Sequence, residues 1–168
     1  GVLALKGIEG DILIEQLYSP ELKKALEENV ALVYSGQSRA SGINNWEVYK
    51  GFFDKRIEVV EGLAAIAKIS TDTRQAILKK DWKKMLELIG LEGEEREKLF
   101  PNITTDKIRD LASALRAQGH AVGLKMCGAG GGGCFILIHH GMPLDALDAL
   151  ILKCNMRRLD FKVEAPLT

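Results

Sequence analysis

The decapeptide KMCGAGGGGC, residues 125–134, constrains this chain most strongly, because five glycines fall within six consecutive positions. Glycine loses more conformational freedom on folding than any other residue, so such a loop indicates backbone at positive φ or in very close contact. Successive amides in a loop of this kind can form a concave phosphate site, and Lys125 could add positive charge. A tight link between two strands that binds nothing would need the same glycines. Composition alone leaves both interpretations open.

The loop also matches G-x-G-x-x-G through Gly128, Gly130 and Gly133, with Asp160 further on in the place of a ribose-binding acid. A dinucleotide-binding motif requires a helix directly after the glycines. Residues 135–138, FILI, instead form an apolar run typical of a strand, and Pro143 indicates that the next helix begins later. The sequence therefore predicts strand, glycine loop and strand.

Working outward from the loop, hydrophobic periodicity and capping signals predict the remaining elements. Strands are predicted at 2–5, 11–17, 30–34, 121–126, 134–139 and 157–163, the first two as a hairpin. Helices are predicted at 19–29, 43–69 (the longest), 71–80, 81–89, 104–118 and 142–154, with residues 90–100 charged and irregular. We expect one α+β domain over residues 1–168, a split β-α-β (ferredoxin-like) antiparallel sheet with helices.

Composition excludes several classes of function. Lysine plus arginine equals aspartate plus glutamate, 23 each, so no overall charge favours nucleic acid or an anionic membrane. No apolar run is long enough to cross a membrane, and no signal peptide is visible. Three sparse cysteines predict buried thiols in a reducing cytoplasm rather than a disulfide framework. His139 and His140 have no third ligand nearby, so no metal site is predicted.

Residues 125–137 resemble the third conserved motif of the GHMP kinases, which include galactokinase, homoserine kinase, mevalonate kinase and phosphomevalonate kinase. Residues 103–108, followed by Gly119, resemble the sugar-kinase branch that contains D-glycero-D-manno-heptose 7-phosphate kinase. Residues 33–41, VYSGQSRAS, are similar to the strand and loop of the same branch. The resemblance extends from Val2 to Val163, and the glycine motif is its most specific part.

The resemblance implies an enzyme that transfers the γ-phosphoryl group of ATP to a hydroxyl or phosphate of a small molecule, with ATP and Mg²⁺ as cofactors. Position for position, it implies cofactor-binding residues Lys125, Gly128, Ala129, Gly130, Gly131 and Gly132. It places Ser38, Arg39 and Ser41 on the substrate side, although Arg39 could equally be an ordinary surface charge. The leading acceptor is a sugar or sugar phosphate, and the mevalonate or phosphomevalonate branch is the alternative.

The family's phosphate loop, P-x-x-x-G-L-G-S-S-A, has no match in these residues, and neither has its catalytic aspartate. The chain is therefore predicted to be a C-terminal half with no catalytic residue of its own, inactive without an N-terminal half that binds most of the ATP and Mg²⁺. Its expected partners are that half and the small-molecule substrate. Residues 2–5 and 11–17 should expose an apolar edge, which also allows a homodimer, and little should hold the glycine loop. A stand-alone ligand-binding or regulatory module is the alternative of another class.

Overall fold

The computed structural model describes residues 3–8, 11–37, 46–100, 102–128 and 130–166. Its main sheet has four strands in the order β4-β5-β3-β6, and every neighbouring pair is antiparallel. The strands are β3 (Val30–Tyr34), β4 (Gly123–Met126), β5 (Cys134–Ile138) and β6 (Arg157–Leu159). Sequence order and sheet order together give the split β-α-β topology, as predicted.

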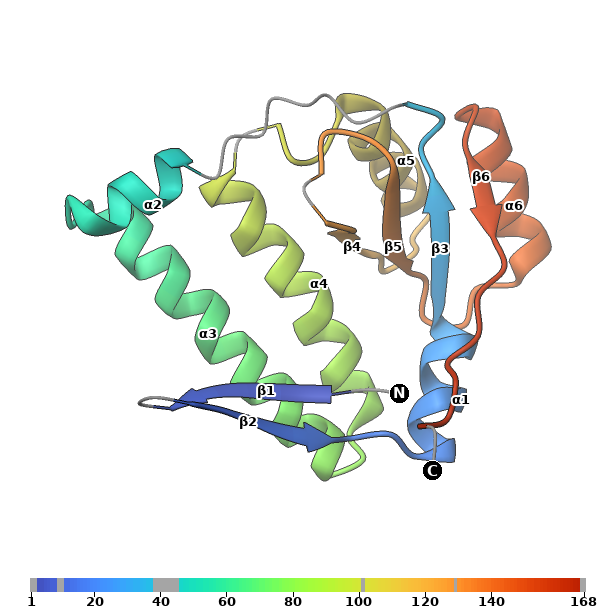
Figure 1. The fold of residues 1–168 in the computed structure, drawn as a ribbon. Coiled ribbons are helices and arrows are strands. Elements are labelled where there is room, and N and C mark those ends of the chain that lie inside the picture. Colours follow the sequence, from blue (N-terminus) through green and yellow to red (C-terminus); the bar gives the residue numbers. More distant parts are fainter. Residues whose placement is uncertain (1–2, 9–10, 38–45, 101, 129, 167–168) are drawn as a thin grey trace.

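Two helices cover one face of this sheet: α5 (Asp106–Ala117) and α6 (Leu144–Lys153) (Figure 1). The core beneath them is continuous, because alternate residues of the central strands point into it. Val33, Phe135 and Leu137 from the strands meet Leu111 and Leu147 from the helices there. This predicted arrangement of sheet and helices holds the glycine loop at one edge of a rigid layer.

Part of the opposite face is covered by helix α1 (Pro20–Asn29) and by α4 (Trp82–Leu99), which lies beside α3 (Ile57–Leu78). Helix α4 crosses β4 at backbone contact. A Cβ on Gly93 would lie 1.9 Å from the carbonyl oxygen of Leu124, and a Cβ on Gly90 would lie 3.2 Å from Cα of Gly123. The prediction that residues 90–100 are irregular is therefore wrong. The helix is continuous to Leu99, and its two glycines allow strand β4 to pack directly against the helix backbone.

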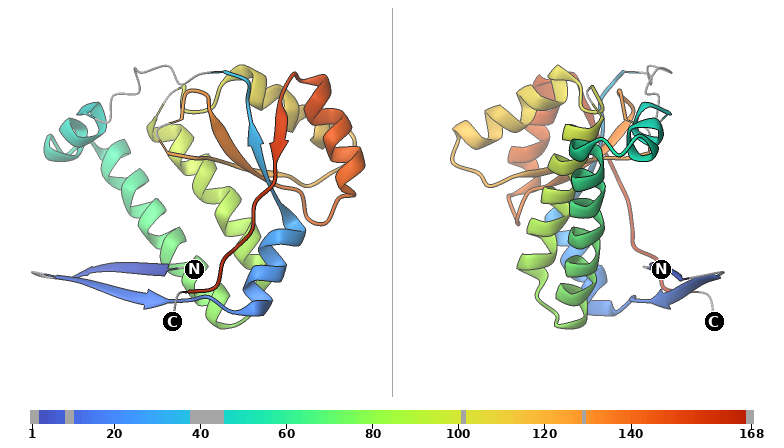
Figure 2. Two further views of the ribbon diagram at one scale, coloured as in Figure 1. Left: turned by 45° about the vertical axis from the view of Figure 1, so that its right-hand side comes forward. Right: turned by 90° about the vertical axis from the view of Figure 1, so that its left-hand side faces the viewer.

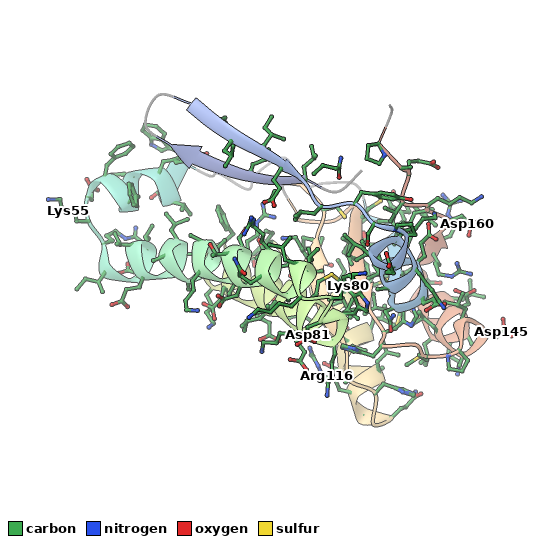
Figure 3. All side chains as sticks on the ribbon, turned by 90° about the horizontal axis from the view of Figure 1, so that it is seen from below. Lys55, Lys80, Asp81, Arg116, Asp145 and Asp160 are labelled. Carbon is green, nitrogen blue, oxygen red and sulfur yellow. The ribbon has the colours of Figure 1, made fainter. Side chains whose placement is uncertain are left out.

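The long predicted helix over residues 43–69 is also wrong in its bounds. Among the described residues it is divided into α2 (Trp46–Phe53) and α3, and α3 runs on through the predicted helix 71–80. Lys55 adopts φ 55°, and the Arg56 amide donates to the Gly51 carbonyl at 2.8 Å, which is a Schellman ending. Figure 3 shows Lys55 at this corner and Lys80 with Asp81 at the turn from α3 to α4. Asp81 caps α4 as predicted.

The first two strands, β1 (Leu3–Ile8) and β2 (Asp11–Gln16), form the predicted hairpin as a separate two-stranded sheet. Figures 1 and 2 show it across the lower ends of α3 and α4, projecting away from the four-stranded sheet. Arg74 of α3 pairs with Glu15 of the hairpin at 2.5 Å. The hairpin exposes Leu3, Leu5, Ile12, Leu13 and Ile14. The expected apolar surface is thus present.

Two smaller predictions need correction. The last strand ends at Leu159 rather than Val163, because the following segment is held by side chains: the Glu27 carboxylate accepts from the Val163 amide at 2.8 Å, and Lys23 donates to the Val163 carbonyl at 3.0 Å. All three cysteines are half-buried rather than buried. Among the described residues no helix is long and apolar enough to span a membrane.

Candidate functional site

The glycine loop joins β4 to β5, and its ends are tied by a bond from the Cys127 amide to the Cys134 carbonyl at 3.0 Å. No helix follows it, so the dinucleotide interpretation is excluded. All five glycines have positive φ, namely Gly128 (68°), Gly130 (76°), Gly131 (71°), Gly132 (123°) and Gly133 (73°). Residues with a Cβ adopt such angles only at a cost, which explains the composition of the loop.

The loop packs against the segment that leads into α5. The Gly131 amide donates to the Ile103 carbonyl at 2.8 Å. A Cβ on Gly130 would lie 2.2 Å from Cγ1 of Ile103 and 2.7 Å from its carbonyl oxygen. The expectation that little would hold the loop is therefore wrong at these positions. Gly130 and Gly132 are buried, whereas Gly128 is exposed and Gly131 is half-buried.

The end of β3 lies directly beside the loop. The Ser35 amide donates to the Gly133 carbonyl, and the Gly133 amide donates to the Gln37 carbonyl, both at 2.9 Å. Lys107, in the first turn of α5, donates to the carbonyls of Ser35 and Asn155, again at 2.9 Å each. One ammonium group thus fastens the segment after β3, the turn before β6 and the start of α5 at the same edge of the sheet.

The predicted site residues fall into two groups. Gly128, Gly130, Gly131 and Gly132 lie together in this loop, and the Gly128 carbonyl accepts from Arg96 at 3.3 Å. Ala129, Ser38, Arg39 and Ser41 lie outside the described residues, so their predicted roles stay predictions. Residues 35–37 nevertheless bring the chain to the glycine loop immediately before the predicted substrate-binding positions.

Lys125 lies on β4 and forms an ion pair with Glu92 of α4, and both side chains are half-buried. Its charge is therefore already compensated, on the sheet face that α4 covers. Its predicted contact with a nucleotide stays a prediction. Among the described residues, no group of three or more His, Cys, Asp and Glu side chains is arranged to hold a metal ion.

Two cavities adjoin these elements. The first, about 480 Å³, is mostly apolar and lies between the hairpin, α1, α3 and α4, with Lys125 and Glu92 in its wall. The second, about 500 Å³, lies near the end of α4 and is lined by Val48, Tyr49, Phe52, Phe53, Leu63, Arg96 and Phe100. Because Arg96 also bonds to Gly128, the second cavity and the glycine loop share a side chain.

One buried polar group lies outside this site. His139, at the end of β5, is 3% exposed, and neither ring nitrogen has a hydrogen-bond partner in the described part of the chain. Burial lowers the pKa of His139, with smaller contributions from His140 and Arg158. The imidazole is therefore held neutral in the core, which agrees with a structural role.

Sequence reasoning missed Arg96 and Lys107. Arg96 fell in the segment assigned as irregular, and its charged neighbours indicated only a solvated surface. Lys107 follows the predicted helix start, where a lysine usually faces solvent. The helical spacing of Met85, Leu88 and Leu99, at intervals of three and eleven residues, was the signal that could have extended α4 past Arg96.

Residues 73–150 match the family model described as GHMP kinases C terminal, a segment that contains α4, α5 and the whole glycine loop. This segment is therefore similar in sequence to the C-terminal domain of the GHMP kinases. The sequence resemblance to this superfamily is confirmed, and so is the α+β fold that it implied. No curated protein matches the chain significantly.

Solved structures share this fold over most of the chain. The Lin0012 protein from Listeria innocua has 21% identity and a TM-score of 0.71, covering 89% of this chain and 41% of that one. L. major mevalonate kinase, solved with R-mevalonate, has 16% identity and a TM-score of 0.66, covering 93% and 47%. Streptococcus pneumoniae phosphomevalonate kinase, solved with phosphomevalonate and AMPPNP, has 18% identity and a TM-score of 0.64, covering 90% and 43%. The chain thus spans less than half the length of each.

Proposed function

We propose that this chain supplies the C-terminal half of the active site of an ATP-dependent small-molecule kinase that phosphorylates a sugar or sugar phosphate. The observation that carries the proposal is the glycine loop. It resembles the family's third motif and lies within the segment that matches the family model. It joins two antiparallel strands, beside the place where residues 35–37 lead into the predicted acceptor segment. ATP supplies the phosphoryl group in such a reaction, and Mg²⁺ neutralises its charge.

The bonds within the loop suit a wall beside the nucleotide better than a complete phosphate cradle. The amides of Gly131 and Gly133 already donate to the carbonyls of Ile103 and Gln37. The ammonium of Lys125 is already paired with Glu92. Gly128 and Gly131 present backbone without side chains, which allows a ligand to approach closely. These features support a division of labour in which the N-terminal half holds most of the ATP and Mg²⁺.

The hairpin is the proposed contact with that N-terminal half. Both of its outer edges lack a strand partner in the described part of the chain, and it exposes five large aliphatic side chains. Free strand edges with apolar side chains favour pairing with another sheet. The N-terminal half would extend this two-stranded sheet, and a second copy of the chain would compete for the same edges.

The test pairs this chain with the polypeptide encoded directly upstream of Gly1. ADP release is measured with a panel of sugars, sugar phosphates, mevalonate and phosphomevalonate. This chain alone should release no ADP and show no micromolar ATP binding by calorimetry, whereas the pair should phosphorylate one sugar-type acceptor. In the pair, Gly128→Ala should lower kcat by about tenfold or more, because misplaced backbone disturbs positioning. Gly119→Ala, with the same backbone strain but remote from the loop, should leave kcat within about twofold.

Other outcomes assign other functions. Transfer to mevalonate or phosphomevalonate alone would move the enzyme to that branch. Micromolar ATP binding by this chain in isolation would refute the division of labour. An upstream sequence without the phosphate loop, together with an inactive pair, would refute the kinase and leave a binding or regulatory module.

A further inference from the structure

Two of the three cysteines stand at the two ends of the glycine loop. Cys127 follows the last residue of β4, and Cys134 is the first residue of β5. The strands pair Met126 with Phe135, and the amide bond from Cys127 to the Cys134 carbonyl extends this ladder by one step. The two cysteines are therefore directly opposite each other in an antiparallel pair.

Their side chains point to the same face of the sheet. Side chains alternate along a strand, and Met126 and Phe135 are both buried in the core beneath α5 and α6. Cys127 and Cys134 consequently point away from that core, and both are half-buried rather than sealed. Cys154 packs against the α5 and α6 core, so it lies on the other side of the sheet.

Strand geometry brings the two sulfurs close to bonding range. Because the Cys127 amide donates to the Cys134 carbonyl, the two residues form a hydrogen-bonded pair, in which Cα atoms and Cβ atoms are each about 5.5 Å apart. A disulfide needs Cα atoms about 4.4–6.8 Å apart and Cβ atoms about 3.5–4.5 Å apart. The Cα separation already suits a disulfide, and the Cβ atoms must approach each other by about 1–2 Å. Gly128, which follows Cys127 and is exposed, can absorb such a shift, because glycine tolerates a wide range of backbone angles.

We propose that Cys127 and Cys134 form a reversible disulfide that fastens the neck of the glycine loop, while Cys154 stays a thiol. The oxidant is a small-molecule disulfide of the glutathione type. One cysteine thiolate attacks it, which forms a mixed disulfide and releases one glutathione thiolate. The second cysteine thiolate then attacks the cysteine sulfur of that mixed disulfide and releases the second glutathione. Two protein thiols are oxidised, and one glutathione disulfide is reduced to two thiols.

The disulfide is a modification site within the proposed nucleotide-facing loop. If the loop acts as proposed above, oxidation restricts the backbone beside the nucleotide, and this consequence rests on the proposed function. The covalent step itself does not, because its formation is measured on this chain without ATP or acceptor. Failure of one proposal is therefore distinguishable from failure of the other.

The reduced chain is incubated with oxidised glutathione, and its thiols are counted and its tryptic peptides analysed. Trypsin cleaves after Lys125 and Lys153, so one peptide carries both loop cysteines and the next carries Cys154. Two thiols should be lost, the loop peptide should lack two hydrogens, and backbone fragments between Cys127 and Cys134 should appear only after reduction. The equilibrium constant for the disulfide should be at least about tenfold higher in the folded chain than in urea, because folding holds the thiols together.

Variants separate this pair from the other combinations. Cys154→Ser should oxidise as the parent does, whereas Cys134→Ser should stop at mixed disulfides. Circular dichroism checks that each variant is folded. The measurements on the parent chain by themselves show whether Cys127 and Cys134 form the disulfide. Stable mixed disulfides at both loop cysteines, a disulfide that contains Cys154, or an equal equilibrium constant in urea would overturn the proposal.

Discussion

The contact between Gly130 and Ile103 can be tested by adding a single carbon. In Gly130→Ala, the new Cβ would lie 2.2 Å from Cγ1 of Ile103 and 2.7 Å from its carbonyl oxygen, at φ 76°. Left-handed backbone costs alanine about 1–2 kcal/mol, and overpacking a tight site costs about 1–3 kcal/mol. Alanine also leaves the unfolded chain fewer conformations than glycine does, but this stabilises the folded state by only about 0.4–1 kcal/mol. The free energy of unfolding should therefore fall by about 2–4 kcal/mol.

Gly119→Ala is the matched control, because Gly119 has φ 86° and no atom lies within 4 Å of its added Cβ. This variant has the backbone strain but no steric clash, so its free energy of unfolding should fall by only about 0.5–1 kcal/mol. Urea unfolding followed by circular dichroism gives both values. Ile103→Ala removes the Cγ1 atom that the new Cβ would meet. The double variant should therefore lose less stability than the sum of the two single variants, and a double-mutant cycle measures this difference as a coupling energy. Equal losses for the two glycine variants, with no coupling to Ile103, would refute the packing explanation.

Three further predictions concern the supports of the site. Gly93→Ala should lower the free energy of unfolding by about 1–3 kcal/mol although alanine favours helix, since its Cβ would lie 1.9 Å from a β4 carbonyl, and an unchanged urea midpoint would contradict this contact. Lys107→Met removes two charge-assisted hydrogen bonds, so the free energy of unfolding should fall by about 1–3 kcal/mol and amide hydrogen exchange at Ser35 should accelerate. Unchanged exchange at Ser35 would show that Lys107 does not fasten this segment. Stability should also fall below pH 6.5, by up to about 1.4 kcal/mol per pH unit, because the unfolded His139 imidazole takes up a proton that its buried form resists. A His139→Gln variant should lose this slope, and the same slope in that variant would assign it to other groups.

The elements that the sequence predicted well have local signals. The strand after the glycine loop was readable from its apolar residues, the start of α4 from Asp81, and the end of α5 from Gly119, whose φ is 86°. In each case the chemistry that forms the element lies within a few residues of it. The antiparallel sheet then follows from the order of its strands.

The errors arose where a distant segment determines the local structure. Gly90 and Gly93 indicate a loop when read alone, and only the approach of β4 explains why a helix contains them. The helix break at Lys55 has no glycine to announce it, because a lysine occupies the left-handed position. The apolar periodicity continues through the break, so periodicity alone joined two helices into one.

The glycine loop was predicted as a link between two strands, but the contacts that support it were not predicted. The glycine motif identified the loop, and positive φ at all five loop glycines, Gly128 and Gly130 to Gly133, accounts for it. Two of these supports join segments that are far apart in sequence: Ile103 fills the space beside Gly130, and Arg96 donates to the Gly128 carbonyl. The same distance hid the pairing of Lys125 with Glu92, which changes the electrostatics expected at that lysine.

Helix α4 has a mechanical consequence. Its 18 residues extend about 27 Å. Within it, about 16 Å separates Met85, in the wall of the first cavity, from Arg96 at the glycine loop. The backbone contacts at Gly90 and Gly93 prevent the helix from sliding across β4, so they act as a fulcrum near its middle. A ligand or protein segment that pushes one end outward would swing the other end inward. We expect movement at the cavity beneath the hairpin to be coupled through α4 to movement at the glycine loop, in the opposite direction.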